Sequence, residues 1–563
     1  MSALVSFLTT AFAFVLLLTV LVFVHELGHF LAARWCGVRV LKFSIGFGKP
    51  IGFGNRRLAW TRGDTEYVVG WLPLGGYVKM LGENIDEIED PEVRAQIQAN
   101  PGESLPEKNT WQKLLIVFAG PIANLILPVV VFMGTLAVGM PRPEAVVGSI
   151  EPGSPAAEAG LQAGDRITQV AEVAVPWWGD LEDTLRGRAG REVTVAYERD
   201  GAPASTQLSV GERAGVDPFG QVVQLGWAGI DHRRRAALLG ITETTVPAAV
   251  AGLRSGEVVE AVGATEVEDW SAFAAAYAAV PAGTTTAFRL RMGEGEEATH
   301  REVTVPALGS PAALGVQPAN VLISTVSPDS AASEAGLQPR DLILSVDGEP
   351  VGSFSAFADS VRTSGGESLT LQIARAGELL AIDVTPRLQN FDAGMGIEEP
   401  RYLVGISAER ASLVGALGVD QELRPWVALP RAVGMTVEVT QTFLQGLGKL
   451  VTGEVSRKQL AGPIGIAEIA GNAFERGWET YLSIMVLISI NLGILNLLPI
   501  PILDGGQAVI FALEGILRAP LSIRTREIAQ QVGFTMLMLL MGLAFWNDLT
   551  RQWTRLIDWL SGA

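Results

Sequence analysis

The amino-acid sequence predicts an α-helical polytopic membrane protein with four transmembrane helices and a large inserted region of α+β domains. Four stretches contain no charged residue and are long enough to cross a bilayer, which takes about 20 residues of helix. They are residues 1–24, 114–140, 480–503 and 528–547. Between the second and third stretches lies a polar region, roughly residues 145–390, in which one sequence pattern occurs three times. A chain of 563 residues is also too long for one ordinary domain.

The first apolar stretch is expected to remain in the protein as a helix. A cleaved signal peptide would begin with basic residues and end in a cleavage site of small residues. Here no Lys or Arg precedes Arg34, and the stretch continues directly into "HELGH" (residues 25–29). The single cysteine, Cys36, excludes an intramolecular disulfide. The net charge of −18 argues against a nucleic-acid partner, because nucleic-acid binding requires a basic patch.

Basic residues in the short flanks of the spans predict the orientation in the membrane. Eight Lys or Arg residues lie between positions 34 and 79, after the first span. Arg518, Arg524 and Arg526 lie between the third and fourth spans. Both loops are therefore predicted to be cytoplasmic, and the polar region extracytoplasmic. Arg551 and Arg555 fit this topology less well, because they would lie outside.

Three copies of one module make up the polar region. "AGLQAGDRI", "AGLRSGEVV" and "AGLQPRDLI" share a frame, in which an acid follows the first glycine by five residues and a bulky aromatic residue follows it by eighteen. Matches at fixed offsets indicate an internal repeat. The glycine spacings of 92 and 84 residues are typical of separate domains rather than of a solenoid. We expect the modules at residues 143–213, 225–308 and 317–388, and the second is the most degenerate.

Each copy has the element order of a small peptide-binding domain. A short apolar strand comes first, a small-residue turn and helix follow, and alternating strands such as "LTLQIAR" close the copy. This order resembles a bacterial PDZ domain, which binds an extended peptide as an added strand beside a helix. The resemblance implies that the modules bind extracytoplasmic peptides or proteins. A spacer that binds nothing is the alternative.

The sequence "HELGH" predicts a metal site at the end of the first span. On a helix, His25 and His29 lie one turn apart on one face. Their imidazole nitrogens can hold one Zn²⁺, with Glu26 beside it as general base. The five-residue pattern alone is a weak signal in a soluble protein, but ionisable groups within a membrane helix are costly and rarely idle. The alternative is an interfacial helix end whose His and Glu side chains are solvated.

A catalytic zinc site needs a third protein ligand, and Asp504 is the predicted one. His232 and His300 lie in the polar region, across the membrane in the predicted topology. Asp504 follows the third span, which like the first ends near the cytoplasmic face, so it lies at the depth of the two membrane histidines. A plain turn acid before the glycine pair is the alternative.

Two prolines, Pro499 and Pro501, break the helix just before this aspartate. Broken backbone within a membrane is tolerated where it lines protein or a wet cavity. A hydrolytic site inside a bilayer requires such a cavity, because hydrolysis consumes water.

"HELGH" in the first span and "NLLPIPILDGG" in the third together resemble the site-2 protease family of intramembrane zinc metalloproteases. The resemblance covers nearly the whole chain. Further matching stretches are "FSIGFGK" (43–49), "DTEYVVGWLPLGGYVKM" (64–80), "AGPIANLI" (119–126), "GKLVTGEVSRKQLAGPIGIA" (448–467) and "LLMGLAFWNDLTR" (539–551).

The resemblance implies roles for individual residues. Zinc would be held by His25, His29 and Asp504, with Glu26 as the catalytic base. "FSIGFGK" and the strand-like run after it would form a membrane-re-entrant β-hairpin whose edge pairs with the unwound backbone of a substrate helix; an ordinary cytoplasmic hairpin is the alternative. The expected substrate-contacting residues are Asn496 and Pro499 of the N-x-x-P-x-P-x-L-D-G motif, and Gly46 and Gly48 of "FSIGFGK".

The remaining chain falls into two halves of a membrane core and a linker. The halves are residues 1–142 and 476–563, and the linker is residues 389–475. Within the linker, residues 425–451 carry apolar side chains at helical spacing, which is typical of a helix on a membrane surface. The chain departs from the family pattern of two tandem PDZ domains, because it has three repeats. The geometry that admits substrates is therefore expected to differ.

The sequence thus predicts an intramembrane zinc endopeptidase of the bacterial cytoplasmic (inner) membrane, with periplasmic modules and an active site near the cytoplasmic face. The resemblance implies single-span membrane substrates in envelope-stress signalling, chiefly an anti-sigma factor already cut outside, and remnant signal peptides. A non-catalytic PDZ receptor that senses envelope peptides is the alternative. A transporter would show two matching broken halves, and one Pro-broken span is found without an inverted partner.

Overall fold

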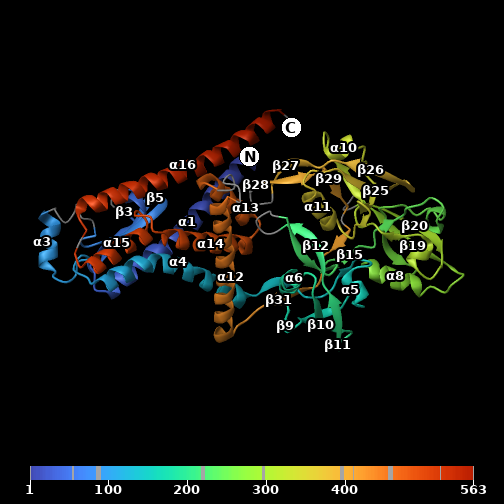
Figure 1. Ribbon diagram of the computed structural model, residues 1–563, viewed down its shortest axis with the longest axis horizontal. Helices are drawn as coiled ribbons and strands as arrows, with labels where there is room; N and C mark the ends of the chain where they lie inside the picture. The colour runs from blue at the N-terminus through green and yellow to red at the C-terminus, as the bar shows by residue number, and fades with distance from the viewer. Residues whose placement is uncertain are drawn as a thin grey trace. The chain divides into compact units, whose positions relative to one another are not determined.

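The computed structural model of the chain describes residues 2–53, 56–83, 91–216, 222–293, 298–392, 398–409, 411–453, 461–519 and 521–561 (Figure 1). Residues 454–460, in the stretch 448–467 quoted above, lie outside this set. Contacts divide the chain into two compact units. The membrane unit comprises Met1–Gly139, Asp392–Glu399 and Gln421–Ala563, and the repeat unit comprises Met140–Phe391 and Pro400–Asp420.

Four helices in the described part of the chain are long and apolar enough to cross a membrane. They coincide with the four apolar stretches of the sequence. The helices are α1 (Ser2–Trp35), α4 (Thr110–Val138), α14 (Trp478–Asn496) and α16 (Ile523–Ser561).

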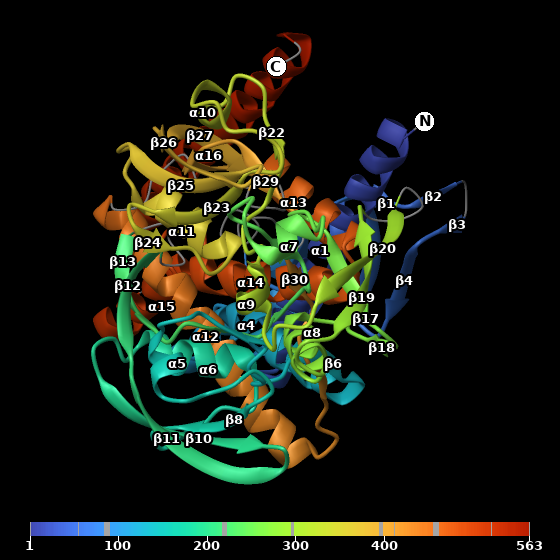
Figure 2. The same cartoon turned by 90° about the vertical axis from the view of Figure 1, so that its right-hand side faces the viewer.

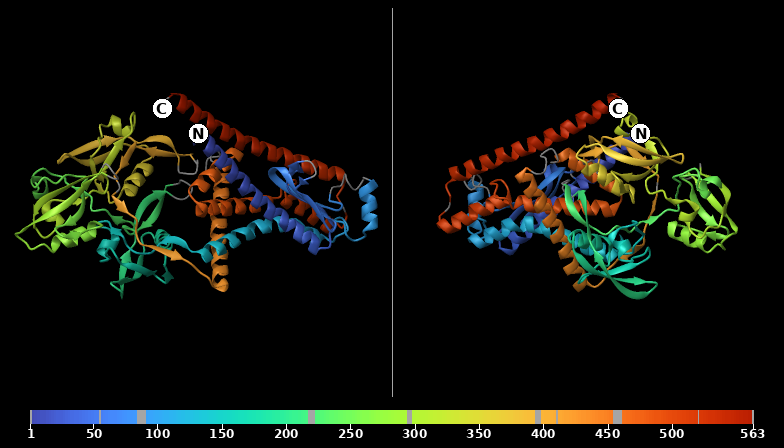
Figure 3. Two further views of the ribbon diagram at one scale, coloured as in Figure 1. Left: turned by 180° about the vertical axis from the view of Figure 1, so that it is seen from behind. Right: turned by 45° about the vertical axis from the view of Figure 1, so that its right-hand side comes forward.

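Helix α4 is central to the membrane unit. It contacts α1, α14, α12 (Pro425–Thr452) and α15 (Asp504–Leu517). Where α4 crosses α1, a Cβ atom on Gly28 would lie 2.3 Å from the carbonyl oxygen of Ala119, so only a glycine allows the two backbones to come this close. The last helix, α16, contacts α13 (Pro463–Glu475), and many of its large apolar side chains are exposed. Figure 3 shows α16 as the long red helix that leads to the C-terminus. A short helix, α3, spans Pro91–Ala99.

A three-stranded antiparallel sheet follows α1, in the order β1-β5-β4. Its strands are β1 (Val40–Pro50), β4 (Ala59–Arg62) and β5 (Thr65–Met80). Two short strands, β2 (Gly52–Phe53) and β3 (Arg56–Arg57), pair with each other in antiparallel fashion. Ile45 of β1 lies opposite both Val69 and Gly76, so β5 folds around β1 and pairs with it twice. The second half of β5 is therefore an edge of this sheet among the described strands. Gly46, at a φ of 85°, provides the bend in β1 that this fold requires.

The break between α14 and α15 lies where the proline pair predicts it. α14 ends at Asn496, and α15 begins at Asp504. A Cβ atom on Gly505 would lie 2.2 Å from the carbonyl oxygen of Leu497, and one on Gly506 would lie 2.1 Å from that of Ile500. The glycine pair therefore lets the first turn of α15 pack directly on the broken segment.

The repeat unit contains three four-stranded sheets of identical strand arrangement, one for each repeat (Figure 2). The orders are β11-β10-β8-β9, β20-β19-β17-β18 and β26-β25-β23-β24. The strands are β8 (Arg166–Val170), β9 (Val173–Ala174), β10 (Glu192–Arg199) and β11 (Ala202–Ser209); β17 (Val258–Val262), β18 (Thr265–Glu266), β19 (Thr285–Met292) and β20 (Thr299–Pro306); and β23 (Leu342–Val346), β24 (Glu349–Pro350), β25 (Leu369–Arg375) and β26 (Glu378–Val384).

Each sheet is covered by a short first helix and a longer second helix. The first helices are α5 (Pro155–Glu158), α7 (Pro247–Val250) and α10 (Ala331–Glu334), and the second helices are α6 (Trp178–Arg186), α8 (Trp270–Ala278) and α11 (Phe354–Thr363). The remaining elements are β6 (Met140–Pro143), β7 (Ser149–Ile150), β12 (Gly211–Val216), β13 (Val222–Trp227), β14 (Ile230–Asp231), β15 (Arg234–Arg235), β16 (Leu239–Gly240), α9 (Pro311–Leu314), β21 (Gln317–Pro318), β22 (Ile323–Val326), β27 (Arg387–Asp392), β28 (Glu398–Leu403), β29 (Ile406–Ala408), β30 (Ser412–Leu413) and β31 (Leu417–Asp420).

The repeated acid forms a buried ion pair in every module. Each acid bonds an arginine on a long strand, and that arginine also donates to the carbonyl oxygen of the repeated glycine. This bond ties the turn after the first helix to the sheet. The pairs are Asp165 with Arg199 (2.7 Å), Glu257 with Arg301 (2.6 Å) and Asp341 with Arg375 (2.7 Å).

Candidate metal centre

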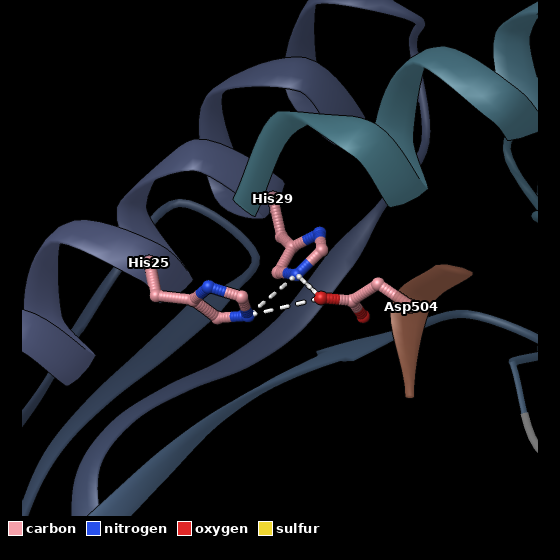
Figure 4. A group of neighbouring side chains, drawn as sticks. All are labelled: His25, His29 and Asp504. Atoms are coloured by element: carbon pink, nitrogen blue, oxygen red, sulfur yellow. Dashed lines mark hydrogen bonds and ion pairs between the residues drawn. The ribbon is translucent and has the colours of Figure 1, made fainter. Parts of the chain in front are cut away.

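Side chains from α1 and α15 meet at one point of the membrane unit (Figure 4). The Nε2 atoms of His25 and His29 lie 3.2 Å apart, and they lie 3.2 and 3.5 Å from Oδ2 of Asp504. A tetrahedral zinc ion with ligand bonds of about 2.0–2.1 Å keeps its donor atoms about 3.3 Å apart. The triangle therefore has the dimensions of one face of such a site. Among the described residues, it is the one group of three such side chains that could hold a metal ion.

The tautomer of His29 suits metal binding. Its Nδ1 lies 2.8 Å from the carbonyl oxygen of Ile116. A carbonyl can only accept, so Nδ1 carries the hydrogen and Nε2 presents its lone pair to the cluster. The ring packs directly on α4, because a Cβ atom on Gly120 would lie 2.2 Å from Nε2. Glycine at this position provides the space for the imidazole.

The environment of His25 also fits a metal ligand. Its Nδ1 lies 3.2 Å from the side-chain amide of Asn124, which is fully buried and whose Oδ1 has no hydrogen-bond partner. An imidazole that binds metal through Nε2 carries its hydrogen on Nδ1 and needs an acceptor there. The Asn124 amide, turned so that Oδ1 faces Nδ1, is that acceptor. Ser489 of α14 donates to the backbone carbonyl of Asn124 at 2.6 Å and so anchors this part of α4.

Glu26 lies beside the triangle and lines the same cavity of about 1400 Å³. Its carboxylate accepts a hydrogen bond from the backbone N–H of Val78 in the second half of β5. The edge of the sheet thus positions this carboxylate. Polar side chains of α4 and α15, among them Lys113 and Gln507, also line the cavity, and a polar cavity can hold the water that hydrolysis needs.

The four expected substrate-contacting residues lie outside the lining of this cavity. Asn496 is the last residue of α14, and Pro499 is exposed in the segment that follows. Gly46 and Gly48 lie in β1, where a Cβ atom on Gly48 would be 2.9 Å from the ring of Trp71. A Cβ atom on Gly46 would lie 2.9 Å from the carbonyl oxygens of Gly70 and Leu72, so both glycines are closely packed within the sheet.

The two histidines of the repeat unit have other partners. His232 lies 3.3 Å from Asp231 and packs beside the ring of Trp178. His300 lies 3.2 Å from Glu260.

Three residues of α4 support the metal centre and were not singled out from the sequence. Ile116, Gly120 and Asn124 are spaced four residues apart, so they share one face of the helix. Each contacts one of the two histidine rings. A buried polar Asn124 in an otherwise apolar span was the available signal, since polar groups in a span face protein and are rarely idle.

Two imidazoles and a carboxylate at the spacing of zinc ligands, with a second carboxylate beside them, lie where the membrane-length helix α1 meets the helix that follows the broken span α14. This arrangement defines a membrane-embedded metalloprotease. The model of peptidase family M50 matches residues 13–540, and the chain belongs to this family. It is a zinc metalloprotease of the site-2 protease type.

Relatives match over almost their full lengths. The regulator of sigma-E protease RseP of Escherichia coli K12 is 33% identical over 550 residues, covering 97% of this chain and 99% of the relative. Protease RseP of Yersinia pestis is 32% identical over 549 residues, with coverage of 97% and 99%. A Neisseria meningitidis serogroup A protein, named as a zinc metalloprotease, is 30% identical over 558 residues, with coverage of 96% and 99%. A PDZ domain protein from Parabacteroides distasonis aligns with 47% of this chain and 95% of its own at a TM-score of 0.12 and 12% identity, which supports no argument about the fold.

Proposed function

We propose that this intramembrane zinc protease uses His25, His29 and Asp504 as its zinc ligands and Glu26 as its general base. The triangle of donor atoms at 3.2–3.5 Å carries the proposal. Bound zinc would supply a Lewis acid that polarises the scissile carbonyl and activates water. The carboxylate of Glu26, held by the Val78 N–H, accepts the proton of the attacking water and delivers it to the leaving amine.

The substitution Glu26→Gln tests the base. It keeps the size and the hydrogen bond to Val78 but removes the proton acceptor. We expect zinc to stay at one equivalent per chain, and cleavage of a single-span substrate in proteoliposomes to fall by about 10²-fold or more. Glu192→Gln makes the same change at an exposed position of the repeat unit and is the matched control. Cleavage by Glu26→Gln at the rate of the control would overturn the assignment.

The substitution Asp504→Ala tests the ligand set. Removing one of three protein ligands leaves a two-histidine site, and we expect the purified protein to lose zinc. Stoichiometric zinc in this variant would exclude Asp504 as a ligand. A receptor that uses only its repeats would need no zinc, so zinc-dependent cleavage separates the protease from that alternative.

We propose that the second half of β5 holds the substrate. A transmembrane helix satisfies its peptide groups within itself, so it must unwind before a peptide bond can be hydrolysed. Tyr77, Val78 and Met80 of β5 line the metal cavity, and this half of β5 is an edge of its sheet. An edge strand offers N–H and C=O groups to an unwound segment. Asn496 and Pro499, at the end of α14 and just after it, contact the segment farther along, and Gly46 and Gly48 of β1 contact it from the sheet, which re-enters the membrane.

We propose an orientation with the metal centre near the cytoplasmic face and the repeats outside. Figure 1 shows α12 running across the direction of α4 and α14, so it would lie along the membrane surface if those helices cross the bilayer. Helix α12 contacts α4, and its Ala428 and Ala432 are buried, while Trp426, Val433 and Val437 are exposed. Its start is tied to the end of α4, where the Glu422 N–H bonds the Leu136 carbonyl. These features suit an interfacial helix.

We propose that the substrates are single-span proteins already cut outside the membrane, chiefly an anti-sigma factor, together with remnant signal peptides. The name of the E. coli relative supports a role in sigma-E regulation. The Glu26→Gln protein, crosslinked in cells and analysed by mass spectrometry, would identify trapped substrates. Recovery of only multi-span or soluble proteins would contradict this substrate class.

A further inference from the structure

Each repeat module contains a corresponding short strand to which a peptide could add, but this strand is not equally accessible to a peptide in the three modules. In each module a glycine with positive φ packs on the first residue before the first helix, and a short strand follows the glycine. A PDZ-type module would add a peptide strand to this short strand, along the second helix. The glycines and their strands are Gly229 with β14, Gly315 with β21 and Gly405 with β29.

The first module leaves little room beside its second helix. The end of strand β13 packs on the end of α6, because a Cβ atom on Gly226 would lie 2.0 Å from the carbonyl oxygen of Leu185. The cavity there is about 160 Å³, and Asp359 of the third module lines it. Ligand pockets usually measure about 300–1,000 Å³. An extended peptide therefore does not fit.

The middle module fills the same place with its own chain. Helix α9 contacts α8, as β13 contacts α6 in the first module, and Pro311 and Leu314 of α9 are buried. The strand β21 consists of Gln317 and Pro318. A proline has no N–H to donate to an added strand. This module is built as a spacer.

The third module is open. A cavity of about 640 Å³ lies between α11 and β29. β29 pairs with β22 on one side and has no strand on its other side among the described strands. Phe357 and Val361 form an apolar floor, and Phe354 is 41% exposed at the rim, whereas the matching Trp178 of the first module is 8% exposed. An apolar peptide end fits this floor.

The far end of this cavity is basic in a chain whose net charge is −18. Three consecutive arginines, residues 233–235, line it, and β15 pairs Arg235 with Ser412 in the chain that continues from β29. Arg234 is neutralised by Asp269 at 3.0 Å. The other charged lining residues are Arg362, paired with Asp359, and Arg401, Asp231 and Glu409.

Arg235 is a half-buried cation without a carboxylate. Its guanidinium donates to the carbonyl oxygen of Ile150 at 2.8 Å. In the described part of the chain, no carboxylate lies within ion-pair distance of it. Burial lowers the pKa of Arg235, although Glu151 and Asp231 at longer range oppose the shift. The exposed Arg233 beside it likewise has no ion-pair partner among the described residues. Charged groups removed from water gain most from a partner of opposite charge.

We infer that Arg235 and Arg233 give the third module a preference for an acidic side chain upstream of the apolar carboxyl terminus of an extended peptide, bound as a strand beside β29. The inference rests on the proposed function, because such an end would be exposed by a first cut outside the membrane. An antiparallel strand added to β29 places its terminus near Gly405 and its upstream residues toward Ser412. At about 3.3 Å per residue, the acid lies about four to six residues before the end.

Fluorescence polarisation with the full-length Glu26→Gln protein in detergent tests the inference. The probes are labelled ten-residue peptides that end in Val and carry either Glu or Gln at the fifth position from the end. A charge-assisted hydrogen bond is roughly twice as strong as a neutral one, so we expect the Glu peptide to bind about tenfold tighter than the Gln peptide. Arg235→Gln keeps a donor for Ile150 but removes the charge, and it should make the two peptides bind equally. Arg191→Gln, an exposed change in the first module, should preserve the preference.

The Ala358→Trp substitution fills the groove from α11 and should abolish binding of both peptides. Equal binding of the two peptides to the parent protein, or a preference that survives both Arg235→Gln and Arg233→Gln, would overturn the acidic specificity. Binding that survives Ala358→Trp would overturn the groove. Failure of peptide binding while the protein with intact Glu26 still cleaves a single-span substrate would defeat this inference alone, and the proposed function would stand.

Discussion

Adding one methyl group to α4 is expected to disable the metal centre. In Gly120→Ala the new Cβ would lie 2.2 Å from Nε2 of His29, whereas non-bonded heavy atoms need about 3.5 Å. The ring must therefore shift by about 1.3 Å, and it would lose either the bond to Ile116 or its place in the triangle. Metal–ligand distances tolerate about 0.2 Å. We expect loss of stoichiometric zinc and at least about 10²-fold slower cleavage.

Contacts at the neighbouring positions of α4 prevent the helix from moving away to accommodate the added methyl group. α4 cannot rotate freely away from His29, because Gly28 of α1 packs on the Ala119 carbonyl one residue earlier. Gly134→Ala, on the same helix, is the matched control, since its added Cβ would have no heavy atom of another segment within 4 Å. Zinc content is measured on purified protein, and cleavage is measured in proteoliposomes. A Gly120→Ala protein with the zinc content and rate of Gly134→Ala would refute the argument.

Three further changes have defined outcomes. Asn124→Ala removes the acceptor for His25 and should weaken zinc binding by about 10–100-fold in a chelator competition, whereas Asn124→Asp, which keeps an acceptor, should retain most of it; equal losses would contradict this role. Asp341→Ala leaves the partly exposed Arg375 without its carboxylate and should destabilise the third module by about 2–3 kcal/mol. Hydrogen exchange over residues 320–408 should rise relative to Glu349→Ala, an exposed control, and unchanged protection would exclude the effect. Asp548→Ala removes the acceptor for the N–H groups of Gly462 and Ile464, each at 3.0 Å, and should speed exchange in the first turn of α13 by about tenfold; exchange at the parent rate would show that water replaces it.

The membrane made much of the site predictable. Its thickness limits where a span can end, so histidines on one span and an aspartate after another could be assigned to the same depth before any packing was known. Charge-free stretches and helical spacing are local properties, and the four spans and the break before Asp504 follow from them.

Contacts between helices were not predictable in the same way. Ile116, Gly120 and Asn124 read in sequence as part of an apolar span, and their role appears only when α4 lies against α1. The same limit applies to Asn496 and Pro499, which the motif associates with the site although they lie outside the lining of the metal cavity.

In the repeats, one feature was predictable from the sequence and another depended on contacts between distant segments. The acid five residues after each glycine marked the three modules, because every module needs the same buried ion pair with a strand arginine. Access to each groove depends on other segments: strand β13 against α6, the inserted helix α9, and arginines from the segment before the middle module.

By itself, the sequence therefore determined the chemistry, the spans and the repeat, because these depend on residue type, spacing and the fixed width of a bilayer. Only the tertiary structure decided which side chains orient the histidines and which of the three modules is open, because both depend on contacts between segments far apart in the chain.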